Sequence, residues 1–144
     1  MTTISAFLTD DHRRCDESFV AAEQLLTQGR WEESRVRCDE FAEAIERHFA
    51  REEKLLFPAF EETTGMTTGP TAVMRMEHQQ IRRMLASLQE ALVRRDRNDC
   101  LGLTETLLML MQQHNAKEEN ILYPMSDRTL GERAADLVAD MQKA

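Results

Sequence analysis

The sequence predicts an all-α protein: an antiparallel up-down-up-down four-helix bundle followed by a short C-terminal helix. Charged residues make up 31% of the 144 residues and aromatic residues 6%, with few glycines and prolines, a composition typical of helical proteins. Apolar residues recur three and four positions apart in four long stretches. The two halves of the chain also repeat one pattern, so we expect two related helical hairpins.

The first helix is expected over about residues 5–28. Apolar residues from Leu8 to Leu26 follow one another at intervals of three and four, which marks the inward face of a bundle helix. Gly29 suits the end of this helix, because glycine adopts the left-handed conformation that often closes a helix.

The second helix begins near Trp31, and its inward face extends to Ala59. Pro58 is expected to kink or loosen the last turn, since proline removes a backbone hydrogen bond. Residues 63–71 are rich in threonine and glycine and form the predicted linker between the two hairpins.

The second half repeats this order. The third helix is expected over about residues 71–95 and the fourth over about residues 98–122, with a polar turn at 94–99 between them. The pattern breaks at residues 127–133, and an amphipathic helix over residues 130–142 closes the chain.

We expect one domain over residues 1–144, with hairpin repeats at about 1–66 and 67–132. The net charge of −8 and the pI of about 5.0 argue against a nucleic-acid partner or an anionic membrane surface. No apolar run is long enough to span a bilayer, and the start of the chain lacks the apolar core of a signal peptide.

Cysteine usage points to a reducing compartment. Cys15, Cys38 and Cys100 are odd in number and show no Cys-x-x-Cys spacing, which argues against a disulfide framework or a thiolate zinc site. We therefore expect a cytoplasmic protein. The sequence leaves both a monomer and a homodimer open.

Two copies of one motif carry all four histidines. Residues 48–58 and 114–124 both read His-x-x-x-Glu-Glu-x-x-Leu-aromatic-Pro and begin 66 residues apart. His12 and His78 are also 66 residues apart. Histidine and glutamate four residues apart share one face of a helix, so this spacing directs both toward the centre of the bundle.

These inward faces predict a metal site. Buried carboxylates need a positive partner, because losing their hydration costs several kcal/mol. No lysine or arginine lies on the same faces, so a metal ion must supply the charge. The predicted ligands are His12, His48, Glu52, His78, His114 and Glu118.

This ligand set favours two metals rather than one. Four imidazoles and two carboxylates exceed what one zinc ion takes, and mixed nitrogen and oxygen ligands suit iron or manganese. In the simplest arrangement Glu52 and Glu118 bridge the two metals, and the histidines pair as His12 with His48 and His78 with His114.

The chain resembles the hemerythrin-like (HHE cation-binding) domains. The resemblance rests on Asp11-His12, Glu77-His78 and the two His-x-x-x-Glu-Glu segments, the second of which ends in Leu122-Tyr123-Pro124. It covers nearly the whole chain. It implies a non-heme di-iron centre with an oxo or hydroxo bridge, in preference to manganese or zinc. It also implies binding or sensing of dioxygen, reaction with peroxide or nitric oxide, or iron handling.

One departure from this family bears on function. Oxygen-carrying members have a fifth histidine four residues before the position of His78, where this chain has Met74; the repeat mate of Met74 is Leu8. By this count both irons keep an open position in a nearly symmetric pair. That arrangement favours binding a small ligand across the metals, or redox turnover, over oxygen carriage.

Further residues are candidates for roles around the ligands: Cys15, Met74, Glu77 and Tyr123. Glu77, together with Glu53 and Glu119, lies one position off the inward faces, so each either faces solvent or orients an imidazole. Cys15 is a core residue or a redox-active thiol. Tyr123 packs in the core or donates a hydrogen bond to a metal-bound ligand.

We therefore expect a di-iron protein that binds or redox-processes dioxygen, peroxide or nitric oxide, using an unidentified electron donor. A peroxidase-like oxidoreductase is one form of this function. The alternatives are a non-catalytic oxygen or redox sensor, and an iron donor for the repair of iron–sulfur clusters. Relatives with the repair role carry an extra cysteine-bearing region, which this sequence lacks.

Overall fold

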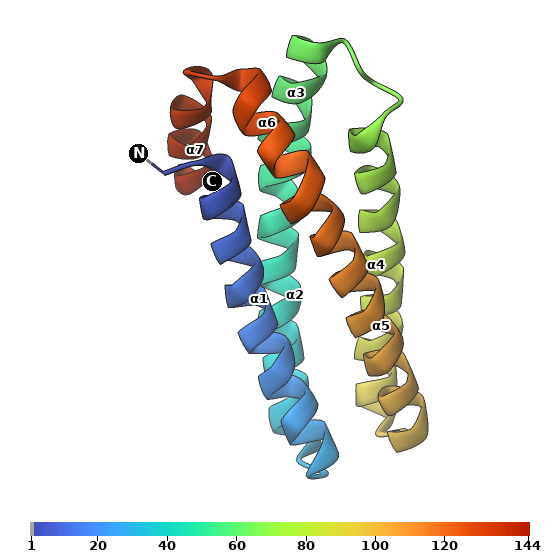
Figure 1. Ribbon diagram of the computed structural model, residues 1–144. Coiled ribbons are helices and arrows are strands. Elements are labelled where there is room, and N and C mark those ends of the chain that lie inside the picture. Colours follow the sequence, from blue (N-terminus) through green and yellow to red (C-terminus); the bar gives the residue numbers. More distant parts are fainter. Residues whose placement is uncertain (1) are drawn as a thin grey trace.

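The protein is described by a computed structural model that covers residues 2–144; residue 1, which the predicted domain and its first repeat include, lies outside the described part. Four long helical stretches run antiparallel, and a short helix packs at the end where both termini lie (Figure 1). The predicted fold class is confirmed. The elements are α1 Ile4–Thr27, α2 Trp31–Arg51, π-helical η1 Glu52–Leu56, α3 Phe57–Thr64, α4 Pro70–Arg94, α5 Arg97–Lys117, π-helical η2 Glu118–Leu122, α6 Tyr123–Leu130 and α7 Arg133–Lys143.

Local sequence explains where the first stretches begin and end. Thr3 caps α1 by accepting a hydrogen bond from the backbone N–H of Ala6 at 3.0 Å. Gly29 and Gly65 have φ angles of 72° and 74°, the left-handed conformation that lets the chain leave a helix, as predicted for Gly29. Asp127, in α6, accepts from the backbone N–H groups of Ile4 and Ser5 at 2.9 and 3.1 Å, which ties the start of α1 to the second hairpin.

Each hairpin contains a π-helical turn, which the apolar periodicity of the sequence does not predict. The irregularity expected near Pro58 takes the form of η1, in which the N–H of Phe57 bonds to the carbonyl of Glu52, five residues back. The helix then continues to Thr64. The second hairpin does the same at η2, so it runs on past residue 122 to Leu130, and the break expected from residue 127 begins only at Gly131.

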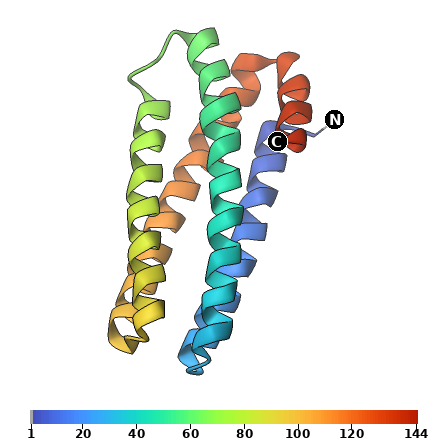
Figure 2. The same ribbon diagram turned by 180° about the vertical axis from the view of Figure 1, so that it is seen from behind.

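Two apolar clusters fill the bundle on either side of its middle. One holds side chains such as Phe19 and Phe41, near the turns that join α1 to α2 and α4 to α5. The other includes Leu8 and Phe60 and is closed by α7, whose Val138 is buried. Figure 2 shows the two hairpins from behind, with these turns at one end and α7 at the other. The repeated spacing of the two motifs places polar residues between the two clusters.

In the described part of the chain, none of the helices combines the length and apolar character that a membrane crossing requires.

Candidate metal centre

The structure brings all six predicted ligands to one level of the bundle. His12 projects from α1 and His78 from α4, while the other four come from α2–η1 and α5–η2. Each of the six is at most 2% exposed. They form a polar layer between the two apolar clusters, away from bulk water.

Within this layer the side chains form two groups that share Glu118. In one group, Glu52, His78, His114 and Glu118 each offer an atom within 4.8 Å of the others. In the other, His12 and His48 do the same with Glu118. The histidine rings lie in two pairs, with centroids 4.5 Å apart for His12 and His48 and 4.9 Å apart for His78 and His114.

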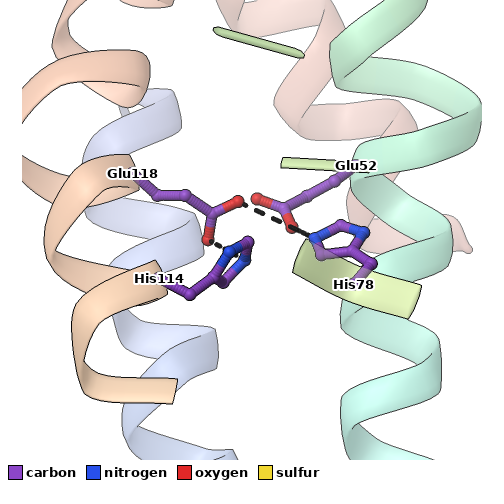
Figure 3. Close-up of side chains that lie close together, drawn as sticks. All are labelled: Glu52, His78, His114 and Glu118. Atoms are coloured by element: carbon purple, nitrogen blue, oxygen red, sulfur yellow. Dashed lines mark ion pairs between the residues drawn. The ribbon is translucent and has the colours of Figure 1, made fainter. Parts of the chain in front are cut away.

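Figure 3 shows Glu52 and Glu118 pointing toward one another from opposite hairpins, beside His78 and His114. The Nε2 atom of His78 lies 3.1 Å from Glu52 Oε1, and the Nε2 atom of His114 lies 3.3 Å from Glu118 Oε1. Four buried atoms of this group find no hydrogen-bond partner among the described residues: Glu52 Oε1, His78 Nε2, His114 Nε2 and Glu118 Oε2. Buried polar atoms are rarely left in this state, and a cation would satisfy all four at once.

Each imidazole is held from behind by a carboxylate. An ionised carboxylate only accepts hydrogen bonds, so each imidazole donates from Nδ1 and turns Nε2 toward the centre, where the neutral ring carries its lone pair. This is the orientation that a metal ligand needs. The four pairs are His12 with Glu119 at 2.7 Å, His48 with Asp11 at 2.8 Å, His78 with Glu53 at 2.7 Å, and His114 with Glu77 at 2.8 Å.

These four hydrogen bonds form a closed ring around the bundle. Asp11 links α1 to α2, Glu53 links the second stretch to α4, Glu77 links α4 to α5, and Glu119 links the fourth stretch back to α1. Of the two roles considered for the off-face glutamates, the structure therefore shows contact with an imidazole. Asp11 was not assigned this role from the sequence, although its repeat mate is Glu77.

Basic side chains hold three of these carboxylates ionised. Arg51 donates to Asp11 at 3.0 Å, and Lys117 contacts Glu77. Arg82 donates to Glu53 at 2.9 Å. Although burial raises the pKa of Glu53, hydrogen bonds from His78 and Arg82 bring it down to about 2. The pKa of Asp11 is also lowered: burial opposes this, but the bonds to His48, Arg14 and Arg51 outweigh it.

Charge at the centre is unbalanced without a cation. Burial, and then the nearby charge of Glu118, raise the pKa of Glu52. Burial lowers the pKa of His114, but the charge and hydrogen bond of Glu118, the charge of Glu52 and the hydrogen bond to Glu77 together lift it to about 9. The pKa of His48 is likewise raised against the effect of burial, chiefly by Glu52. The buried carboxylates therefore favour positive charge in this layer.

Tyr123 reaches into the same layer. Its hydroxyl donates to Glu52 Oε2 at 2.7 Å or to Glu118 Oε1 at 2.9 Å, and lies 3.1 Å from His12 Nε2. Burial and the charges of both glutamates hold its pKa well above the usual value. Tyr123 is therefore more than a packing residue: it contacts residues of both hairpins at the centre.

The remaining candidates lie in the apolar clusters. Met74 is buried in the cluster closed by α7. Cys15 is a free, buried thiol in the other cluster, and burial raises its pKa to about 11, which makes it a poor nucleophile.

Comparison with known proteins supports the resemblance seen in the sequence. The hemerythrin HHE cation-binding domain model matches residues 3–126. An uncharacterized hemerythrin-like protein of Schizosaccharomyces pombe is 26% identical over 136 residues, 92% of this chain and 63% of that protein, so the chain spans less than two thirds of its relative. No solved structure gave a significant match. The chain belongs to the hemerythrin HHE cation-binding domain family.

Proposed function

We propose that this chain holds two iron ions in its polar layer and uses them to bind or redox-process a small oxidant such as dioxygen, peroxide or nitric oxide. The proposed ligands are His12, His48, Glu52, His78, His114 and Glu118. One observation carries the proposal: buried imidazole nitrogens and carboxylate oxygens converge without a hydrogen-bond partner in the described chain, and the carboxylates behind the imidazoles aim Nε2 inward.

The donor atoms favour iron over zinc. A zinc site in a protein takes four ligands, whereas this layer offers six, four imidazoles and two carboxylates, arranged as two groups that share Glu118. Paired carboxylates and imidazoles inside a four-helix bundle are a known way to hold two irons. The approximate two-fold repeat supports two metal positions rather than one.

Burial supports a small substrate. The six residues are at most 2% exposed, so a molecule that reaches them has to pass between packed side chains. Iron at this position would supply the redox chemistry and the electrophilic site. The chain holds the imidazoles through the Nδ1 ring of hydrogen bonds, and its two apolar clusters exclude bulk water from the layer.

Metal analysis tests the metal assignment. Protein loaded with ferrous iron and oxidised in air should retain about two irons per chain and show the near-ultraviolet band of an oxo-bridged pair. Glu118→Gln should lose iron, because Glu118 belongs to both groups. Glu105→Gln is the matched control, since Glu105 is an exposed carboxylate on α5. Colourless protein that holds one zinc ion would contradict the proposal.

Peroxide consumption tests the redox function. Iron-loaded protein should consume hydrogen peroxide in the presence of a reductant, and His114→Ala should abolish this while far-ultraviolet circular dichroism stays helical. A dioxygen adduct that forms and releases its ligand unchanged, with no peroxide consumption, would instead favour the sensor.

A further inference from the structure

One buried pair of repeat mates at the metal centre differs by a hydroxyl group. Tyr123 and Phe57 are repeat mates, 66 residues apart, and each is the first residue after a π-helical segment. Tyr123 stacks on His12 with centroids 5.6 Å apart and an interplanar angle of 29°. Phe57 stacks on His78 at 5.6 Å and 26°. Both rings are fully buried, so the phenolic hydroxyl is what sets them apart.

That hydroxyl lies among four side-chain atoms of the polar layer, two from the imidazoles of His12 and His48 and two from the carboxylates of Glu52 and Glu118. It is 2.7 Å from Glu52 Oε2, 2.9 Å from Glu118 Oε1, 3.1 Å from His12 Nε2 and 3.5 Å from His48 Nε2. A phenol has one proton to donate, so it cannot bond to all four through hydrogen. The atoms without partners belong to His78, His114 and the two carboxylates.

The geometry points to Tyr123 as a phenolate ligand of the iron held by His12 and His48, which makes the two iron positions chemically different. This inference rests on the proposed iron centre. When ferric iron binds, the Oη–H bond breaks, an Oη–iron bond forms and the proton leaves to the buffer, with no change in oxidation state. A hard, anionic oxygen suits ferric iron, as the tyrosine ligand of some haem proteins illustrates.

The assignment replaces the nearly symmetric pair expected from the sequence. With Tyr123 bound, the position between His12 and His48 gains an oxygen ligand. On the other side, Phe57 stacks on His78 and has no oxygen to offer, so the position between His78 and His114 would keep a coordination site for a small molecule.

The test compares four proteins loaded with ferrous iron and oxidised in air: wild type, Tyr123→Phe, Phe57→Tyr, and the double variant that exchanges the two residues. Wild type should show a visible phenolate-to-iron charge-transfer band and resonance-enhanced phenolate vibrations. Tyr123→Phe should lose both signals while it keeps its iron and its near-ultraviolet band. Phe57→Tyr should strengthen the visible band, and the double variant should restore it.

The outcomes separate this inference from the proposed function. Wild type that holds iron without the visible band, or a Tyr123→Phe variant with an unchanged band, would overturn the ligand assignment and leave the iron centre standing. Wild type that takes up no iron would overturn the proposed function itself. Circular dichroism verifies folding, and if Phe57→Tyr does not fold, the loss of the band in Tyr123→Phe decides the question alone.

Discussion

At the scale of single residues, carboxylates that adjoin one histidine in the sequence form hydrogen bonds with a different histidine on a neighbouring helix. Asp11 adjoins His12 in sequence but bonds to His48, and Glu77 adjoins His78 but bonds to His114. Helical periodicity places these carboxylates one position off the inward face. The carboxylate side chain then reaches the neighbouring helix, where its hydrogen bond orients the imidazole ring of a histidine.

Replacing Asp11 with asparagine tests this role. The amide oxygen can still accept the hydrogen bond from His48 Nδ1, but the negative charge that favours that tautomer is lost. We expect iron affinity to fall by roughly 10- to 100-fold, measured by competition with a chromogenic chelator, with the same iron content at saturation. Asp10→Asn is the control, because Asp10 is exposed and its ion pair is with Arg14, not with an imidazole. Equal affinities for both variants would contradict the role.

The ligands themselves were predictable, whereas their partners were not. Four-residue spacing and the 66-residue repeat identify the inward histidines and glutamates from the sequence alone. The choice between solvent and an imidazole for Glu53 depends on where α4 packs, which is a tertiary property. For Asp11 one signal existed, since its repeat mate Glu77 was already a candidate.

At the scale of elements, the π-helical segments decide what Tyr123 does. Residues five apart point in different directions on an α-helix, so Tyr123 and Glu118 read as separate faces in the sequence. In η2 a hydrogen bond joins these two residues, and the wider turn brings them to one side. Pro58 and Pro124 indicate an irregular turn, but the spacing of apolar residues does not distinguish a kink from a π-helical turn.

The join between hairpins gives a prediction at this scale. Asp127 of α6 caps α1 through the N–H groups of Ile4 and Ser5 and through the Ser5 hydroxyl at 2.8 Å. Asp127→Ala leaves those donors without their acceptor and should lower the free energy of unfolding by about 1–2 kcal/mol, measured by urea titration. Asp140→Ala, an exposed change on α7, should alter it by less than about 0.5 kcal/mol. A similar small effect for both would show that the cap is unimportant.

At the scale of the whole molecule, one polar layer crosses a bundle that is apolar above and below it. The ring of four imidazole–carboxylate bonds joins all four long helical stretches at that level. The alternation of apolar and polar inward positions made this architecture readable in the sequence. The ring could not be read there, because each of its bonds joins two helices that are separate in the chain.

The same layer couples metal binding to the stability of the whole bundle. A ligand that binds only the folded chain adds RT ln(1 + [L]/Kd), about 2.7 kcal/mol per site when free metal is a hundred times its Kd. Ferrous iron should therefore raise the unfolding midpoint in anaerobic thermal scans, and a chelator should reverse the gain. Glu118→Gln should reduce the gain, because Glu118 belongs to both groups, while Glu105→Gln should keep it. Identical unfolding midpoints with iron and with chelator would mean that iron does not bind preferentially to the folded chain. A cation would then not explain why these buried nitrogen and oxygen atoms converge.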